Sequence, residues 1–333
     1  MDSATSSTAP IRWGILGTGA IADKFATGLQ SLPDASLAAV GSRAAATADA
    51  FADRFGAARR YASYEALAAD PEIDIVYVAT PHPMHHTAAK LCLEAGKPVL
   101  CEKPFTVNAT EAREVIALAR ERKLFLMEAM WTRFLPLMVR FRELIAAGAI
   151  GEPRLLTADF GFRHNGDASH RLFNPNYAGG ALLDVGVYVV SLASMIFGQP
   201  ERGTGMADIG PTGVDEQTAL VFGYPGGKLA QLTVAIRTNT PQEVTLMGTE
   251  GAIRIPPIWW KPTTLTIARP GKPDERIDEP FVGNGYNYEA AEAMRCLRAG
   301  ELESPGMPLD ETISIIRTLD QARAQFGLKY PME

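Results

Sequence analysis

The sequence predicts two domains, an α/β domain with a parallel sheet followed by an α+β domain with an antiparallel sheet. Three observations predict this fold class. The chain has 333 residues, which is more than one domain usually holds. Its first part alternates strand and helix patterns, and the apolar run Ile73–Ala79 is of the kind that a buried parallel strand needs. Beyond residue 150, alternating strand patterns separated by Gly and Pro turns replace this order. We expect a tail over residues 1–10, a first domain over 11–130 and a second over 131–333.

Composition and charge are typical of a soluble globular protein. Apolar residues make up 47% and charged residues 21% of the chain, and the net charge is −6. With a pI near 5.5 and no basic run, neither a nucleic acid nor a membrane is expected as a partner. The cysteines Cys92, Cys101 and Cys296 form no CxxC pair, which suits a reducing compartment. No stretch approaches the ~20 apolar residues that span a bilayer. Residues 1–10 are small and polar, unlike a signal peptide, so we expect a cytoplasmic location.

The first strand pattern, Ile11–Leu16, runs into a glycine turn and then a helix. In a dinucleotide-binding turn the first glycine makes the sharp bend, and the second lets a pyrophosphate approach the backbone. The third position needs only a small side chain, which Ala22 supplies. Free N–H groups at the helix start would then bind the phosphate. An ordinary strand–helix turn is the alternative, but a second strand follows about 20 residues later, as a nucleotide site requires. The predicted cofactor contacts here are Gly17, Thr18, Gly19, Ala20 and Ile21.

The end of the second strand indicates which dinucleotide is bound. A site for NAD carries Asp or Glu there, to accept hydrogen bonds from the ribose 2′-hydroxyl. This sequence has Ser42 and Arg43 instead. A guanidinium with a hydroxyl beside it suits a 2′-phosphate, by charge and by geometry. A solvated arginine at a helix start is the alternative, but its position favours NADP.

Two later strands end in polar loops. Residues 80–86 follow the run 73–79, and Glu102-Lys103-Pro104 follows the strand 98–101. Because ligands bind at the carboxyl ends of parallel strands, both loops are expected at the site. His82, His85 and His86 lie close together, but no Cys or carboxylate accompanies them at ligand spacing, so no metal is predicted. Beside a nicotinamide, Lys103 would hold ribose hydroxyls and lower the pKa of a neighbouring acid, whereas alone it would be a surface lysine in a turn.

The remaining elements follow in chain order. Helices are expected over Ala45–Phe55, Tyr64–Ala69, Thr87–Ala95, Ala109–Arg122, Leu137–Ala147 and Leu309–Phe326, the last ending before Gly327. Short strands are expected near Arg60–Tyr61 and over Leu124–Glu128, which leads to Trp131 and Arg133 at the start of the second domain. Strands of the second domain are expected over Arg154–Phe162, Gln217–Tyr224, Lys228–Ile236, Glu243–Gly248, Gly251–Ile255 and Thr264–Ala268.

An apolar helix is expected over residues 179–188, between the first two of these strands. Asp184 and Tyr188 are four residues apart, so on a helix they share one face, with Cβ atoms about 6 Å apart. The apolar neighbours, Leu183 and Val187 among them, indicate that the helix is buried. A buried carboxylate and phenol need partners or a function. A structural tyrosine is the usual outcome, but the combination with Lys103 favours a catalytic one.

Five motifs, in the same order, resemble those of the Gfo/Idh/MocA oxidoreductases, the family of glucose–fructose oxidoreductase and inositol 2-dehydrogenase. The resemblance covers nearly the whole chain and is strongest to the dimeric dihydrodiol dehydrogenase (NADP-dependent D-xylose dehydrogenase) subgroup. It implies a Rossmann domain followed by an α+β domain with a large, mostly antiparallel sheet, whose open face forms a homodimer interface. The motifs are Gly17-Thr-Gly-Ala-Ile-Ala22, Thr80-Pro-His-Pro-Met-His85, Leu100-Cys-Glu-Lys-Pro104, Leu126-Met-Glu-Ala-Met-Trp-Thr-Arg-Phe134 and Gly179-Gly-Ala-Leu-Leu-Asp-Val-Gly-Val-Tyr188.

The resemblance also implies roles for individual residues. Lys103 is similar to a lysine that binds the cofactor ribose and assists proton transfer, and Tyr188 to the catalytic tyrosine of the subgroup. Asp184 is similar to an aspartate that shapes the substrate site. Further cofactor contacts are expected from Thr80, Pro81, His82, His85, Glu102, Trp131 and Arg133, and substrate contacts from His82, Trp131, Phe160, Arg171, Asn174 and Trp260.

These features predict an NADP-dependent dehydrogenase or reductase that acts on CH–OH groups. The hydride would pass between the nicotinamide and a carbinol carbon of an aldose such as D-xylose, or of a trans-dihydrodiol. Tyr188 would act as general acid and base, with its pKa lowered by Lys103. The alternatives are an NADPH-dependent reductase of a keto sugar such as 1,5-anhydrofructose, a non-catalytic NADP-binding sensor, and a glycosidase that uses a nicotinamide transiently.

Overall fold

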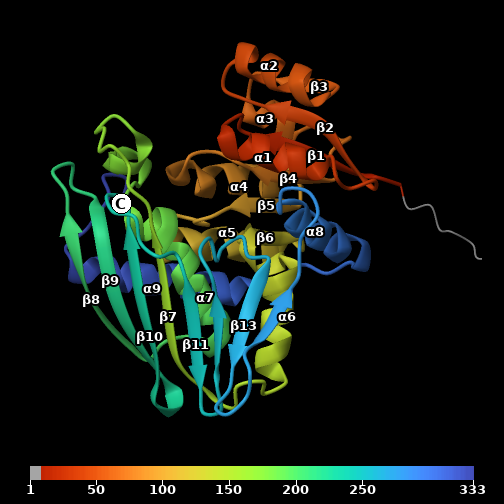
Figure 1. The fold of residues 1–333 in the computed structure, drawn as a ribbon. Helices are drawn as coiled ribbons and strands as arrows, with labels where there is room; N and C mark the ends of the chain where they lie inside the picture. The colour runs from red at the N-terminus through yellow and green to blue at the C-terminus, as the bar shows by residue number, and fades with distance from the viewer. Residues whose placement is uncertain (1–8) are drawn as a thin grey trace, which may run out of the picture.

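The computed structural model describes residues 9–333, so the expected tail over residues 1–10 lies almost wholly outside the described residues. Two sheets organise the chain (Figure 1). The first has six strands, all parallel, in the order β3-β2-β1-β4-β5-β6. The strand order reverses between β1 and β4, which is where doubly wound sheets bind ligands. Its strands are β1 (Ile11–Leu16), β2 (Ala35–Gly41), β3 (Arg59–Tyr61), β4 (Ile75–Val78), β5 (Val99–Glu102) and β6 (Leu126–Ala129), and its helices are α1 (Ala20–Leu29), α2 (Ala45–Phe55), α3 (Tyr64–Ala68), α4 (His85–Glu94) and α5 (Ala109–Arg122).

The second sheet has eight strands in the order β14-β13-β12-β11-β7-β10-β9-β8. Neighbouring strands run antiparallel, except for the inner pair β7 and β10, which is parallel. The predicted mostly antiparallel sheet is therefore confirmed. Its strands are β7 (Pro153–Gly161), β8 (Arg202–Ile209), β9 (Asp215–Tyr224), β10 (Lys228–Ala235), β11 (Val244–Gly248), β12 (Ala252–Ile255), β13 (Thr264–Ala268) and β14 (Glu275–Asp278).

The two outermost strands of this sheet, β8 and β14, were not predicted. Both are edge strands, and most of their side chains are exposed on both faces. An edge strand that is solvent-exposed on both faces needs no alternation of apolar and polar residues. That alternation is the signal that identifies a half-buried strand. The glycines of β8 and the charges of β14 are typical of such edges.

The later helices connect the two halves of the molecule. They are α6 (Pro136–Ala146), α7 (Val187–Phe197), α8 (Asn287–Ala299) and α9 (Leu309–Gln325). Helix α9 packs against α7 beside the second sheet and against α5 of the first domain. Helix α8, which was not predicted, packs against α1 and the turn at Trp131. Its buried positions include Ala290, Ala293 and Met294, so its apolar stripe is too narrow to stand out in the sequence.

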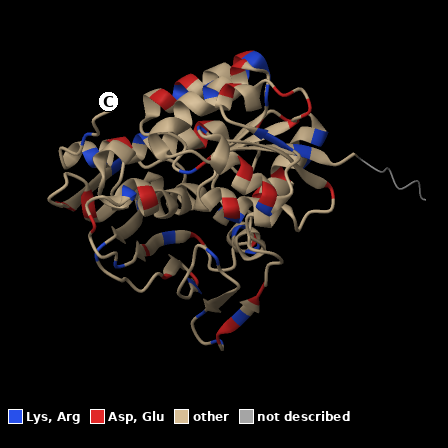
Figure 2. Ribbon diagram, turned by 90° about the horizontal axis from the view of Figure 1, so that it is seen from above, with Lys and Arg blue, Asp and Glu red and all other residues tan. Residues whose placement is uncertain are grey.

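One segment, Pro175–Phe197, is long and apolar enough to cross a membrane, which corrects the expectation that no stretch approaches this length. It includes α7, and 83% of its most apolar window is buried inside the protein. Because a core helix meets the same criterion, the burial identifies this segment as part of the interior. Charges of both signs are interspersed along the rest of the chain (Figure 2).

The face of the second sheet opposite α7 carries exposed apolar side chains. Val221 of β9 and Leu229 of β10 are 44% and 40% exposed, and Met206 of β8 is 81% exposed. Pairing of Met206 with Ala219, and of Val221 with Gln231, puts these side chains on one face. This face therefore has the apolar character of an interaction surface.

Candidate active site

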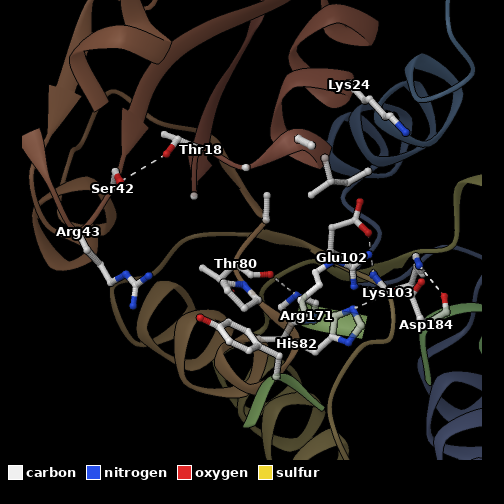
Figure 3. Close-up of a pocket in the computed structure, with 18 of the residues that line it drawn as sticks. Thr18, Lys24, Ser42, Arg43, Thr80, His82, Glu102, Lys103, Arg171 and Asp184 are labelled. Carbon is white, nitrogen blue, oxygen red and sulfur yellow. Dashed lines mark hydrogen bonds and ion pairs between the residues drawn. The ribbon is translucent and has the colours of Figure 1, made fainter. Parts of the chain in front are cut away.

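A cavity of about 570 Å³ lies at the carboxyl ends of β1, β4 and β5 (Figure 3). Its position agrees with the crevice expected beside the β1–β4 reversal. Both halves of the chain contribute to its wall. The first contributes Gly17, Thr18, Gly19, Ala20, Ile21, Lys24, Ser42, Arg43, Tyr64, Ala79, Thr80, Pro81, His82, His85, Glu102 and Lys103, and the second Arg171, Tyr177, Asp184, Tyr188 and Tyr286.

The glycine turn leaves room for a ligand at the start of α1. Gly17 has a φ of +107°, and a Cβ there would lie 2.6 Å from the carbonyl oxygen of Ala79, so the position requires glycine. A Cβ at Gly19 would meet nothing within 4 Å. Gly19 is also the N-cap of α1, and no side chain caps this end. The first N–H groups of the helix are thus available to a phosphate, as the dinucleotide pattern predicts.

Hydroxyl groups and one guanidinium form the end of the cavity next to β2. The Ser42 and Thr47 hydroxyls are 2.6 Å apart, and Thr18 Oγ1 lies 3.5 Å from Ser42 Oγ. Arg43 is exposed and lies beside Tyr64. The acidic residues of the cavity wall, Glu102 and Asp184, belong to the opposite end near Lys103 (Figure 3). The end next to β2 therefore has the positive charge that a 2′-phosphate needs.

Two buried polar atoms of the wall have no hydrogen-bond partner among the described residues. They are Thr80 Oγ1 and His82 Nδ1, and both residues lie in the loop after β4. A buried polar atom without a partner is costly, so these atoms point to a ligand that would bind them. Together with the glycine turn, they fit a nicotinamide dinucleotide lying across the strand ends with a substrate beside it.

Lys103, Asp184 and Tyr188 meet at the inner end of the cavity. Lys103 Nζ donates a hydrogen bond to the carbonyl oxygen of Asp184 at 2.9 Å, and it lies 4.7 Å from the centre of the Tyr188 ring. The Tyr188 hydroxyl accepts a hydrogen bond from Trp131 Nε1 at 2.9 Å. The predicted meeting of a lysine from the first half with a phenol from the second is therefore present in the structure.

The expected effect of Lys103 on Tyr188 is not present. Burial raises the pKa of Tyr188 well above its ordinary value, although the hydrogen bond from Trp131 acts in the opposite direction. The lysine ammonium lies over the ring, and its charge does not offset this burial. Burial likewise lowers the pKa of Lys103, against the opposing effect of Asp184 and Glu102. In this structure Tyr188 is a neutral phenol that retains its proton.

Asp184 is a buried, ionised carboxylate. Burial alone would raise its pKa, but the positive charges of Lys103 and Arg171 outweigh burial and lower the pKa to about 2. Arg171 Nη1 donates to Asp184 Oδ1 at 2.7 Å. His82 Nε2 lies 3.9 Å from the same oxygen, and burial lowers the pKa of His82 to about 3. His82 is therefore neutral, with one ring nitrogen near Asp184 and the other without a partner among the described residues.

The helix that carries Asp184 is wider than predicted. Residues Leu182–Gly186 form a π-helical turn, and the α-helix α7 begins only at Val187. Asp184 and Tyr188 are thus not one regular α-helical turn apart, yet both line the cavity. Single π turns inside helices occur often at functional sites, because they redirect side chains.

The predicted aromatic substrate residues lie behind Tyr188 and do not line the cavity. Phe160 stacks on Trp260 with ring centres 3.6 Å apart and lies 5.4 Å from the Tyr188 ring. Trp131 stacks on Tyr286 at 4.6 Å and is 4% exposed. These rings pack around Tyr188, and their contact with a substrate stays a prediction.

Arg133 and Asn174 are not part of the cavity wall either. The buried Arg133 guanidinium donates to Ser191 and to Glu311 Oε1, the latter at 2.6 Å. The Asn174 side chain accepts from the N–H of Asn176 and caps a short 3₁₀ turn. Both residues thus have a structural place in the fold, and their predicted contacts with a ligand stay predictions.

His85 lines the cavity but uses both ring nitrogens within the fold. One lies 2.8 Å from the carbonyl oxygen of Pro104 and the other 2.7 Å from that of Thr80. It therefore joins the loops after β4 and β5. No group of three or more His, Cys, Asp and Glu residues within residues 9–333 is arranged to hold a metal ion.

Lys24, Tyr64, Tyr177 and Tyr286 line the cavity and were missed in the sequence. Lys24 had a usable signal, because it lies one turn after the start of α1, on the helix that follows the glycine turn. The three tyrosines lie in or beside segments that no motif marks. Chain folding alone brings them to the site.

Comparison with known proteins identifies both halves of the chain. Residues 11–130 match the family model of oxidoreductases with an NAD-binding Rossmann fold, and residues 138–254 match the GFO/IDH/MocA C-terminal domain. The chain is 42% identical to trans-1,2-dihydrobenzene-1,2-diol dehydrogenase of Mus musculus and 39% identical to that of Homo sapiens. Each alignment covers 97% of this chain and 99% of the relative.

Solved structures show the same architecture. KijD10, a 3-ketoreductase from Actinomadura kijaniata solved in complex with NADP, is 26% identical, with a TM-score of 0.85 over 95% of this chain and 97% of that one. An aldose–aldose oxidoreductase from Caulobacter crescentus has a TM-score of 0.86 at 22% identity, over 95% of this chain and 98% of that one, and shares the fold. The chain belongs to the GFO/IDH/MocA oxidoreductase family.

Proposed function

We propose that the protein is an NADP-dependent oxidoreductase that interconverts a CH–OH group and a carbonyl group in a sugar or a trans-dihydrodiol. The observation that carries this proposal is that Lys103, Asp184 and Tyr188 meet in the cavity that the glycine turn also lines. A proton-bearing phenol and a nucleotide site within one cavity are what a hydride-transfer reaction needs. The relatives named trans-1,2-dihydrobenzene-1,2-diol dehydrogenase support this reaction class.

Each polar residue of the inner cavity has a part in this proposal. The bound nicotinamide nucleotide supplies the hydride donor or acceptor. Tyr188 gives its hydroxyl proton to the substrate oxygen during reduction and takes it back during oxidation. Asp184 and His82 bind substrate hydroxyls, since the one is an ionised acceptor and the other has an unpartnered ring nitrogen. The Lys103 ammonium stabilises negative charge that develops near the phenol.

The cofactor preference is proposed from the end of the cavity next to β2. Arg43 is exposed at the cavity wall, and the Ser42 and Thr47 hydroxyls lie beside it. A guanidinium forms strong, charge-assisted hydrogen bonds with a phosphate group. The ketoreductase structure that contains NADP supports the same preference.

A two-direction screen tests the proposed function. Oxidation is followed with NADP⁺ or NAD⁺ against D-xylose, D-glucose, inositols and trans-1,2-dihydrobenzene-1,2-diol, through nicotinamide absorbance. Reduction is followed with NADPH and 1,5-anhydrofructose. We expect turnover with NADP(H) in at least one arm. A protein that binds NADPH tightly but turns over none of these compounds would contradict the proposal and would favour a nucleotide sensor.

A keto sugar reductase is the second candidate, and the state of Tyr188 favours it. Burial keeps the phenol protonated, which suits the general acid that a carbonyl reduction requires. The ketoreductase among the solved relatives supports this direction. The reduction arm of the screen separates this candidate from an aldose or dihydrodiol dehydrogenase.

The raised pKa of Tyr188 predicts a different pH dependence for each direction. Between about pH 6 and 9 the phenol stays protonated, so the kcat of reduction should change little. Oxidation needs a phenolate, whose fraction rises about tenfold per pH unit below the pKa, so the kcat of oxidation should rise with pH. Asp184 and His82, with pKa values of about 2 and 3, do not titrate in this range. An oxidation profile with its maximum near neutral pH would contradict this assignment.

We also propose a homodimer formed through the second sheet. The exposed Met206, Val221 and Leu229 side chains on one sheet face support it. Light scattering should give about twice the chain mass of 35.9 kDa. Val221→Lys should shift the protein toward the monomer, because it buries a charge in the interface. A monomeric wild type at micromolar concentration would exclude the dimer.

A further inference from the structure

The turn that precedes Asp184 is packed without room for side chains. Gly180 has a φ of +112°, and a Cβ there would lie 2.2 Å from Asp215 Oδ1. A Cβ at Gly179 would lie 2.6 Å from the carbonyl oxygen of Leu172. The Gly180 N–H also donates to that carbonyl oxygen at 2.8 Å. The turn over residues 179–182 is therefore placed by its surroundings and not by side chains of its own.

Two buried side chains from distant parts of the chain hold this turn. The Tyr330 hydroxyl donates to the carbonyl oxygen of Gly179 at 2.7 Å, and Tyr330 is 1% exposed. Asp215 Oδ2 accepts from the N–H of Leu182 at 2.8 Å, and Asp215 is fully buried. We call these two side chains the anchor pair. Neither lines the cavity, so each can affect chemistry only through the turn.

The anchor residue Tyr330 is itself fixed in place. The Arg323 guanidinium lies over the Tyr330 ring, 5.5 Å from its centre. Glu333 accepts a hydrogen bond from the backbone N–H of Tyr330. Arg323 also donates to Asp320 at 2.8 Å, and Asp320 accepts from the N–H of Ala109 at 2.8 Å, at the start of α5. Backbone of the first domain is thus connected to the turn before Asp184 through the last residues of the chain.

Asp215 is fixed from a different side. Thr218 donates to the same Asp215 oxygen at 2.7 Å, and both residues belong to β9 of the second sheet. The turn therefore has one anchor on the sheet and one on the segment after α9. Because the π-helical turn begins at Leu182, both anchors act within five residues of Asp184.

We propose that Tyr330 and Asp215 are positioning residues that hold the turn over residues 179–182 so that Asp184 and Tyr188 point into the cavity. The inference rests on the roles of Asp184 and Tyr188 in the proposed function. A catalytic group that is misplaced by about 1 Å loses up to a hundredfold in rate. Loss of an anchor should therefore lower kcat more than it weakens nucleotide binding, since the glycine turn lies in the other half of the molecule.

Tyr330→Phe tests the first anchor, because it removes one hydroxyl and keeps the buried ring. We expect a folded protein with an unchanged Kd for NADPH and a kcat reduced about tenfold. Amide hydrogen exchange of the peptide over residues 180–188 should be faster. Tyr224→Phe is the matched control, because Tyr224 is buried and its hydroxyl forms no hydrogen bond with a described residue. Tyr224→Phe should change neither kcat nor the hydrogen exchange of this peptide.

Paired variants test the second anchor. Asp215→Asn keeps an oxygen that can accept from Leu182 and Thr218, so it should retain most of the turnover. Asp215→Leu removes both acceptors and should resemble Tyr330→Phe in kcat and in exchange. Equal kcat and equal exchange in wild type and Tyr330→Phe would overturn the proposal, even if Asp215→Leu fails to fold. Amide hydrogen exchange also separates failure of the anchor proposal from failure of the proposed function. It reports on the turn even if the wild type turns over no compound of the screen.

Discussion

Replacing Tyr188 with phenylalanine should lower turnover by about 10³-fold and leave NADPH binding unchanged. General acid–base catalysis contributes about 10²–10⁴-fold, and Tyr188 provides the phenolic proton next to Lys103. The phenylalanine ring would keep its contacts with Phe160 and with the ammonium of Lys103, so the cavity should keep its shape. Steady-state kinetics gives the change in turnover, and NADPH fluorescence gives the Kd.

The control for this prediction is Tyr177→Phe, which removes another hydroxyl from the same cavity wall. Tyr177 is 45% exposed and its hydroxyl forms no hydrogen bond with a described residue, so its loss should reduce turnover by less than about tenfold. If Tyr188→Phe retained wild-type turnover, the tyrosine would have no role in proton transfer. A large loss in Tyr177→Phe alone would move that role to Tyr177.

The second large effect is expected at the opposite end of the cavity. Arg43→Asp should lower kcat/KM for NADP⁺ by about 100-fold, and it should raise the relative use of NAD⁺. A hydrogen bond to a charged group contributes about 1.5–3 kcal/mol, and the new carboxylate would also repel a 2′-phosphate. The same carboxylate could accept hydrogen bonds from the ribose hydroxyls of NAD. The measurement is kcat/KM for both cofactors at a fixed substrate concentration.

Arg140→Asp is the matched control for the charge change. Arg140 pairs with Glu143 on the surface helix α6 and is not part of the cavity wall. The control should leave the cofactor ratio unchanged. A wild type that prefers NAD⁺, or an Arg43→Asp variant with the wild-type ratio, would refute the assignment of Ser42 and Arg43 to a 2′-phosphate.

Much of the fold could be predicted because its buried strands have continuous or alternating apolar patterns. Residues 11–16 and 75–78 are fully or partly buried parallel strands, and both were found within a few residues. The edges β8 and β14 carry no such pattern, because neither of their faces is buried. The comparisons confirm the oxidoreductase family and the fold class. NADP preference stays a prediction.

The candidate site was predictable where chemistry requires particular residues next to a strand end. Gly17 and Lys103 fall in this class, and both line the cavity. The aromatic residues do not fall in this class, because a sequence does not show whether a ring faces a cavity or packs against the residue that does. Trp131 and Phe160 are of the second kind. The π-helical turn at residues 182–186 has no sequence signal either, since helical periodicity assumes a regular turn.

The wide turn before α7 fixes the direction in which the phenol faces. A regular helix advances by about 100° per residue, as 3.6 residues complete one turn. A π turn holds one residue more than a regular turn, so it changes the angle at which Asp184 and Tyr188 stand to each other, and Tyr188 follows it by one residue. The length of this short segment is consequently as important to the chemistry as the identity of its side chains. A single-codon deletion that restored a regular helix would therefore change the angle between Asp184 and Tyr188, even with both side chains retained.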